Sequence, residues 1–122
     1  MPQSPLISVI DDDDSLRHAL VELLESFGYR AAAFASAEAF LAGGQAAASD
    51  CIVTDIQMPG LSGVDLKHRL VETGVGSPVI MMTARTEPGL HQRAQDSGAV
   101  CLLRKPFTAD ALMACLDRAL QA

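Results

Sequence analysis

Five polar residues stand at the ends of short apolar segments. Asp11 and Asp12 follow one such segment, and Asp55 follows another. Thr83 ends a third segment, and Lys105 comes directly after a fourth. Together they offer three carboxylates, one hydroxyl and one ammonium group. A phosphoryl transfer onto a carboxylate needs these groups as cation ligands, nucleophile and donors to the phosphoryl oxygens.

The segments that carry these residues alternate between apolar runs and amphipathic stretches, which predicts a parallel α/β fold. We expect strands at 6–10, 29–35, 51–54, 77–82 and 100–103. Helices should follow them: one stopped by Gly28, a short one opened by Ser36, then 64–71, 88–97 and one capped by Thr108. The predicted fold is a five-stranded parallel sheet, doubly wound with helices on both faces. The whole chain, 1–122, is expected to form a single domain.

The amphipathic stretches differ in how much apolar surface they offer. The first helix should bury its 16, 19, 20, 23, 24 and 27 positions, and the last its 111, 112, 115, 116, 119 and 120 positions. The 88–97 helix has chiefly Leu90 and Ala94 to bury, so we expect it to pack shallowly. Three histidines, His18, His68 and His91, fall on polar faces of separate helices. Histidine catalysis is therefore not indicated.

Strand order 2-1-3-4-5, common in doubly wound sheets, gathers the polar residues at one edge. Neighbouring strands lie ~4.8 Å apart, so Asp11, Asp12 and Asp55 should come within a few ångströms of one another. Thr83 should lie on the other side of Asp55, with Lys105 starting ~10 Å away, a distance that a lysine side chain largely covers. Three carboxylates that close raise one another's pKa unless a cation is present. An oxygen-only site favours Mg²⁺.

Four motifs in this sequence resemble the receiver domain of two-component response regulators. They are Val-Ile-Asp-Asp-Asp at 9–13, Thr-Asp at 54–55 with Met-Pro-Gly-Leu-Ser-Gly at 58–63, Met-Thr-Ala at 82–84, and Lys-Pro-Phe at 105–107. Each motif is short, but the four stand in the order and at the element ends that a receiver requires. The resemblance runs from about residue 7 to residue 120.

The resemblance implies a magnesium ion and its ligands. Asp11 and Asp12 would lie at the metal, Asp55 would be both ligand and phosphoacceptor, and the backbone carbonyl of Gln57 would be a further ligand. Phosphorylation would come from the phosphohistidine of a sensor histidine kinase, with no turnover of a separate substrate.

The resemblance also implies how the phosphoryl group is held and sensed. Thr83 would bond a phosphoryl oxygen, Lys105 would pair with the phosphoryl group, and the bond before Pro106 would be cis. Receivers change a surface formed by the fourth helix, fifth strand and fifth helix, which often dimerises and serves transcriptional regulation. Leu102 stands where the family usually has an aromatic residue that swings inward, so the signalling step is expected to be weaker or differently built.

Two other functions are compatible with part of the pattern. Small magnesium-dependent phosphatases of the haloacid dehalogenase kind also use an aspartyl nucleophile after a strand, but they typically carry a second Asp where this chain has Gln57. A receiver-like scaffold that is never phosphorylated is the other alternative, and Leu102 keeps it open. Turnover of a small phosphate ester would favour the phosphatase, and anion binding without a structural response would favour the scaffold.

Composition limits the partners and the compartment. The formal net charge of −6 and the presence of only five aromatic residues, one Tyr and four Phe, argue against nucleic-acid binding by this domain. No apolar run approaches the ~18 residues of a membrane span, and the N-terminus lacks a basic secretory start. We therefore expect a cytoplasmic protein without membrane contact. The cysteines, Cys51, Cys101 and Cys115, are expected to be reduced core thiols.

Overall fold

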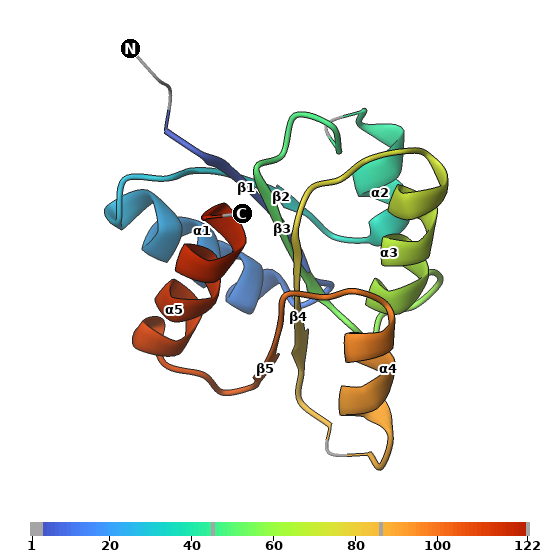
Figure 1. The fold of residues 1–122 in the computed structure, drawn as a ribbon. Helices are drawn as coiled ribbons and strands as arrows, with labels where there is room; N and C mark the ends of the chain where they lie inside the picture. The colour runs from blue at the N-terminus through green and yellow to red at the C-terminus, as the bar shows by residue number, and fades with distance from the viewer. Residues whose placement is uncertain (1–3, 45, 86, 122) are drawn as a thin grey trace.

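Strands and helices alternate along the chain in a computed structural model that describes residues 4–44, 46–85 and 87–121 (Figure 1). The strands are β1 (Leu6–Ile10), β2 (Arg30–Phe34), β3 (Cys51–Asp55), β4 (Val79–Thr83) and β5 (Cys101–Arg104). The helices are α1 (Asp14–Ser26), α2 (Ala37–Ala42), α3 (Gly63–Glu72), α4 (Leu90–Asp96) and α5 (Ala109–Leu120). The first three residues, on which the secretion prediction depended, and the last residue of the predicted domain lie outside the described residues.

The five strands form one parallel sheet in the order β2-β1-β3-β4-β5, which confirms the predicted topology. The register pairs Ile10 with Thr54 and Thr83 with Arg104. As a result the carboxyl ends of β1, β3, β4 and β5 lie at one edge, and the residues that follow them share that edge.

The helices cover the sheet on both faces, with α1 and α5 on one side and α2, α3 and α4 on the other (Figure 1). Buried apolar side chains from each helix pack on the sheet. Every residue of β3 and β4 is buried. The helix residues at the centres of the two cores are Leu20, Leu24, Leu112 and Leu116 on the first face and Phe40, Leu66, Leu70 and Leu90 on the second.

Three of the strands, β3, β4 and β5, end one residue later than predicted. Their last residues, Asp55, Thr83 and Arg104, each have a partner in a neighbouring strand. In α1 the predicted inward positions Ala19 and Phe27 are wrong: Ala19 is exposed, and Phe27 is 52% exposed. Phe27 follows the last helical residue, and the chain turns away at Gly28, whose φ of 91° suits glycine.

The fourth helix confirms the prediction of shallow packing. It is shorter than predicted, and its buried residues are Leu90 and Ala94. Its cap residue, Gly89, supplies no side-chain hydrogen bond, whereas Asp13, Ser36, Ser62 and Thr108 cap the other four helices. Within the described residues, no helix has the length and apolar character needed to cross a membrane.

Candidate functional site

Three carboxylates meet at the carboxyl edge of the sheet. One carboxylate oxygen from each of Asp11, Asp12 and Asp55 lies within 4.8 Å of the others. Asp11 and Asp12 follow β1, Asp55 ends β3, and these two strands are neighbours. Asp11 is fully buried and Asp55 is 6% exposed, whereas Asp12 is exposed to solvent. The cluster therefore has two buried members and one that faces outward.

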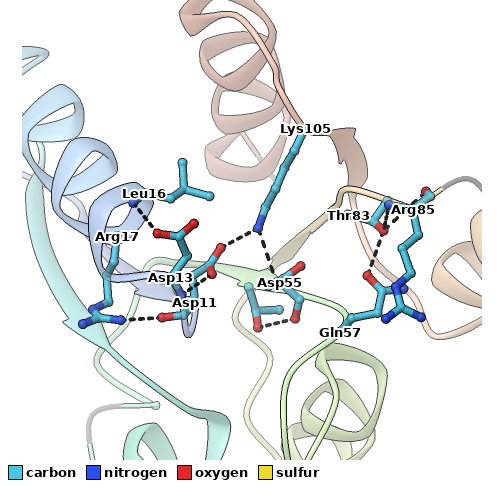
Figure 2. A network of polar contacts seen from close by, with 10 residues as sticks. Asp11, Asp13, Leu16, Arg17, Asp55, Gln57, Thr83, Arg85 and Lys105 are labelled. Atoms are coloured by element: carbon cyan, nitrogen blue, oxygen red, sulfur yellow. Dashed lines mark hydrogen bonds and ion pairs between the residues drawn. The ribbon is translucent and has the colours of Figure 1, made fainter.

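Lys105 reaches into this cluster from the end of β5 (Figure 2). Its Nζ lies 2.7 Å from Asp11 Oδ2 and 3.5 Å from Asp55 Oδ2. The following bond, between Lys105 and Pro106, is cis. The ammonium group thus provides a counter-charge between the two buried carboxylates.

Asp11 is held from its other side by contacts that the sequence pattern did not predict. Its Oδ1 accepts a hydrogen bond of 2.9 Å from the backbone N–H of Asp13, and its carbonyl oxygen accepts one of 2.7 Å from Arg17 Nη1. Arg17 also pairs with Asp14 one turn earlier on α1. The acid–arginine spacing of three in the first helical turn was the available sequence signal, although it does not reveal the contact with Asp11.

The electrostatics of the site follow from burial and from this charge arrangement. Burial raises the pKa of Asp55 from its usual 3.8 to about 6; Asp11 and Asp12 act in the same direction, and Lys105 opposes them. Burial alone would lower the pKa of Lys105, but its hydrogen bond to Asp11 and the charges of Asp55 and Asp11 outweigh burial, so the pKa is raised. Without a further cation, the cluster therefore resists full ionisation of Asp55.

Thr83 lies on the other side of Asp55 and makes neutral contacts (Figure 2). Its hydroxyl donates a hydrogen bond of 2.9 Å to Gln57 Oε1 and accepts one of 3.0 Å from the backbone N–H of Arg85. Gln57 Oε1 is the nearer of the two acceptors of this hydroxyl, because the carbonyl oxygen of Arg85 lies at 3.5 Å. The Arg85 side chain points to solvent, where it pairs with Glu87 at 3.0 Å.

The loop after Asp55 is shaped by a close approach of the backbone. The backbone N–H of Gly63 donates to Ile56 O at 3.0 Å, and a Cβ at Gly63 would lie 2.6 Å from the carbonyl oxygen of Asp55. Glycine is the residue that permits this contact. Ser62 and Asp65 then form a capping box that begins α3. These contacts fix where Asp55 stands relative to the loop.

Two open cavities adjoin the site. Asp12 and Gln57 line one of about 720 Å³, which also reaches Arg85. Thr83 and Leu102 line another of about 360 Å³ together with His91.

The structure thus brings together Asp11, Asp12, Asp55 and Lys105 as predicted, with Gln57 and Thr83 beside them. The predicted roles of these residues remain predictions.

Comparison with known proteins associates the chain with one family. The sequence model of the response regulator receiver domain matches residues 7–117. The transcriptional regulatory protein FixJ of Azorhizobium caulinodans is 42% identical over 120 residues, which is 98% of this chain and 57% of that protein. The response regulator protein TmoT of Ectopseudomonas mendocina is 33% identical over 119 residues, 98% of this chain and 54% of that protein. The chain spans about half the length of the curated relatives it matches.

Solved structures agree with the sequence comparison. The crystal structure of FixJ-N has a TM-score of 0.88 and 30% identity, covering 98% of this chain and 96% of that chain. The chemotaxis protein CheY4 of Vibrio cholerae has a TM-score of 0.85 and 29% identity, covering 96% of this chain and 99% of that one. Sequence and fold therefore lead to the same family.

Proposed function

Because the chain belongs to the response regulator receiver domain family, we propose that it accepts a phosphoryl group on Asp55 and thereby changes the surface it offers to a partner. The observation that carries this proposal is the position of Asp55: a nearly buried carboxylate at a strand end, within 3.5 Å of the Lys105 ammonium group. Receiver domains are phosphorylated by sensor kinases, and we propose a sensor histidine kinase as the donor. The chemistry is confined to the domain's own phosphorylation and dephosphorylation.

The carboxylate cluster fits a magnesium ion. Asp11, Asp12 and Asp55 supply hard oxygen ligands within 4.8 Å of one another, and Asp12 faces outward, where an ion with several waters can enter. The backbone carbonyl of Gln57 would complete the protein ligands. When bound, the ion would neutralise charge on the transferring oxygens. The raised pKa of Asp55, caused first by burial, supports the need for such a cation, because the nucleophile must be ionised.

Lys105 and Thr83 would hold the phosphoryl group from two sides. The Lys105 ammonium group lies closer to Asp11 than to Asp55. It can therefore turn toward a phosphoryl group on Asp55 by exchanging one anionic partner for another. The Thr83 hydroxyl would donate to a phosphoryl oxygen after leaving Gln57 Oε1, its partner in this structure.

The change at Thr83 would be transmitted to the surface formed by α4, β5 and α5. The shallow packing of α4 supports its role as the movable element. We propose that this surface forms a homodimer or contacts an output domain for transcriptional regulation, with Leu102 replacing the usual aromatic switch. We further propose one receiver domain over 1–122 that acts in the cytoplasm, without direct contact of its own with nucleic acid or membrane.

Incubation with acetyl phosphate and Mg²⁺, followed by intact mass measurement, tests the proposal. We expect one added phosphoryl group on the wild type, none on Asp55→Asn, and none when EDTA removes the metal. Asp117→Asn, an exposed aspartate on α5, should be labelled like the wild type. Labelling that persists in Asp55→Asn would refute the assignment of the phosphoacceptor.

A further inference from the structure

Two cysteines meet away from the acidic cluster, between β5 and α5. Cys101 begins the edge strand β5 and is half-buried, whereas Cys115 on α5 is buried. Both line an open cavity of about 510 Å³ between α4, β5 and α5. All three cysteines are free, as predicted, and Cys101 packs against the core, but it is only partly covered and lines this open cavity. Cys51 is fully buried and does not line the cavity.

The sulphur of Cys101 has a guanidinium group beside it. Arg118 Nη1 donates a hydrogen bond to Cys101 Sγ at 3.4 Å, and Cys115 lines the same cavity as Cys101 and Arg118. Arg118 follows Cys115 by three residues on α5, so both side chains lie on the helix face that meets β5. A guanidinium group beside a sulphur stabilises the negative charge that the sulphur carries when it attacks an electrophile.

We propose that Cys101 and Cys115 form a redox-sensitive thiol pair that closes to an intramolecular disulfide when a hydroperoxide, such as hydrogen peroxide, enters the cavity. Cys101 is the attacking thiol, because it is the more exposed of the two and has Arg118 beside it. Cys115 is the resolving thiol. Arg118 is a positioning residue that acts through the sulphur of Cys101.

The two steps balance. In the first, the Cys101 thiolate attacks one oxygen of hydrogen peroxide; an S–O bond forms, the O–O bond breaks, and hydroxide leaves the sulfenic acid behind. In the second, the sulphur of Cys115 attacks the sulfenic sulphur; an S–S bond forms, the S–O bond breaks, and the hydroxide takes up the Cys115 proton as water. Overall, two thiols are oxidised by two electrons and one peroxide is reduced to two waters.

The same geometry explains the division of roles between the thiols. Burial, followed by the hydrogen bond to Cys101, raises the pKa of Cys115 to about 12. Cys115 therefore stays protonated at neutral pH and is a poor first nucleophile, but it lines the same cavity as the sulphur that is oxidised first. Burial also raises the pKa of Cys51 to about 12, and this fully buried thiol does not line the cavity. Cys51 thus serves as an internal reference, a thiol of the same chain that we expect peroxide to leave unoxidised.

The test treats the purified, fully reduced chain with hydrogen peroxide, blocks free thiols with iodoacetamide under denaturing conditions, and measures intact mass. We expect two blocked thiols to be lost, together with about 2 Da, the mass of two hydrogen atoms. Trypsin cleaves after Arg104, between the two cysteines, so the disulfide should appear as a linked pair of peptides that a thiol reductant separates. Cys51 should remain free to react with the blocking reagent.

Single substitutions assign the roles of the two thiols and of Arg118. Cys115→Ala, which retains an apolar side chain in the core, should stop at a dimedone-reactive sulfenic acid on Cys101. Arg118→Gln should slow disulfide formation roughly tenfold, because it removes the positive charge beside the sulphur. Cys51→Ala and Asp55→Asn should form the disulfide at the wild-type rate, the latter because the inference does not rest on the phosphoacceptor.

Three results would overturn the inference. One is a peroxide-treated wild type that keeps three free thiols under conditions that oxidise the same chain unfolded in urea. Another is a disulfide between Cys101 residues of two chains in place of the intramolecular one. The third is an oxidation rate that Arg118→Gln leaves unchanged.

Discussion

The two sides of Asp55 are held by contacts of different kinds. On the charged flank, formed by Asp11, Asp12 and Lys105, an ammonium group lies 2.7 Å from a fully buried carboxylate. On the neutral flank, formed by Gln57 and Thr83, a hydroxyl donates 2.9 Å to an amide oxygen. Removal of one member of a buried ion pair leaves an uncompensated charge, whereas loss of a neutral hydrogen bond costs ~1 kcal/mol. The two flanks therefore differ in how easily they can rearrange.

This difference separates the chemistry of the site from its response. The charged flank can bind a cation and stabilise a phosphoryl group, but any change in it is opposed by large electrostatic energies. The neutral flank can exchange Gln57 for a phosphoryl oxygen at little cost. It also connects directly to the segment before α4, the helix that buries only Leu90 and Ala94. Mutations on the two flanks should accordingly have effects of different size and kind.

Replacement of Lys105 should have the largest effect on stability. In metal-free buffer near neutral pH, we expect Lys105→Met to lower the free energy of unfolding by about 3–5 kcal/mol, because Asp11 and Asp55 lose their shared counter-charge. Urea denaturation with and without Mg²⁺ measures this. The ion should restore more stability to the variant than it adds to the wild type, since it replaces the missing positive charge.

The matched control for this change is Lys67→Met, which removes the only other lysine of the chain. Lys67 lies on α3 and approaches Gly98, and the ion pairs of Asp11 and Asp55 within the described residues are with Lys105. Its replacement should change stability by less than ~1 kcal/mol, as for most half-exposed positions. Equal losses of stability from the two replacements would contradict a special role of Lys105 as the counter-charge of the charged flank.

Replacement of Asp55 should stabilise the metal-free protein in a pH-dependent manner. The pKa of Asp55 is raised from 3.8 to about 6, chiefly by burial, so folding must overcome the cost of ionising a buried acid above pH 6. Stability of the wild type should therefore fall as pH rises from about 4 to 6, by on the order of 2–3 kcal/mol in this one contribution. Asp55→Asn should lack this loss and be the more stable protein at pH 7.5.

Denaturation curves of the two proteins at several pH values check the sign. The difference in their free energies of unfolding should be small near pH 4 and should reach its full size above pH 6. Millimolar Mg²⁺ should reduce the difference at pH 7.5, because the ion stabilises the ionised wild type. If Asp55→Asn proved less stable than the wild type at pH 7.5 without metal, ionisation of the buried Asp55 would not destabilise the fold as described.

Much of this arrangement could be predicted because it depends on strand order and on residues at strand ends. Once Asp55 was placed after the third strand and Lys105 after the fifth, parallel pairing brought them to one edge with few alternatives. The family resemblance then supplied roles that geometry alone could not. The same reasoning predicted that Leu90 and Ala94 would be the main buried residues of α4, because helical periodicity is visible in the sequence.

Contacts that depend on side-chain rotamers could not be predicted in the same way. The contact of Arg17 with the carbonyl of Asp11 depends on the direction of a long, flexible side chain. The partial exposure of Cys101 depends on its position in β5, the edge strand of the sheet, next to an open cavity. Periodicity assigns a residue to a face of an element, but it does not say how completely the next element covers that face.

Truncation of Gln57 should have the smallest effect on stability and should act on the rate of reaction. Gln57→Ala removes the acceptor of the Thr83 hydroxyl, so we expect less than ~1 kcal/mol change in unfolding free energy. Because the hydroxyl then loses the nearer of its two acceptors and keeps only the distant carbonyl oxygen of Arg85, labelling by acetyl phosphate should become about two- to tenfold faster, the equivalent of one neutral hydrogen bond. Gln95→Ala, an exposed glutamine on α4, is the matched control and should leave the rate unchanged. If Gln57→Ala were labelled at the wild-type rate, breaking the hydrogen bond between the Thr83 hydroxyl and Gln57 would cost nothing. The neutral flank would then contribute nothing to the activation barrier of phosphorylation.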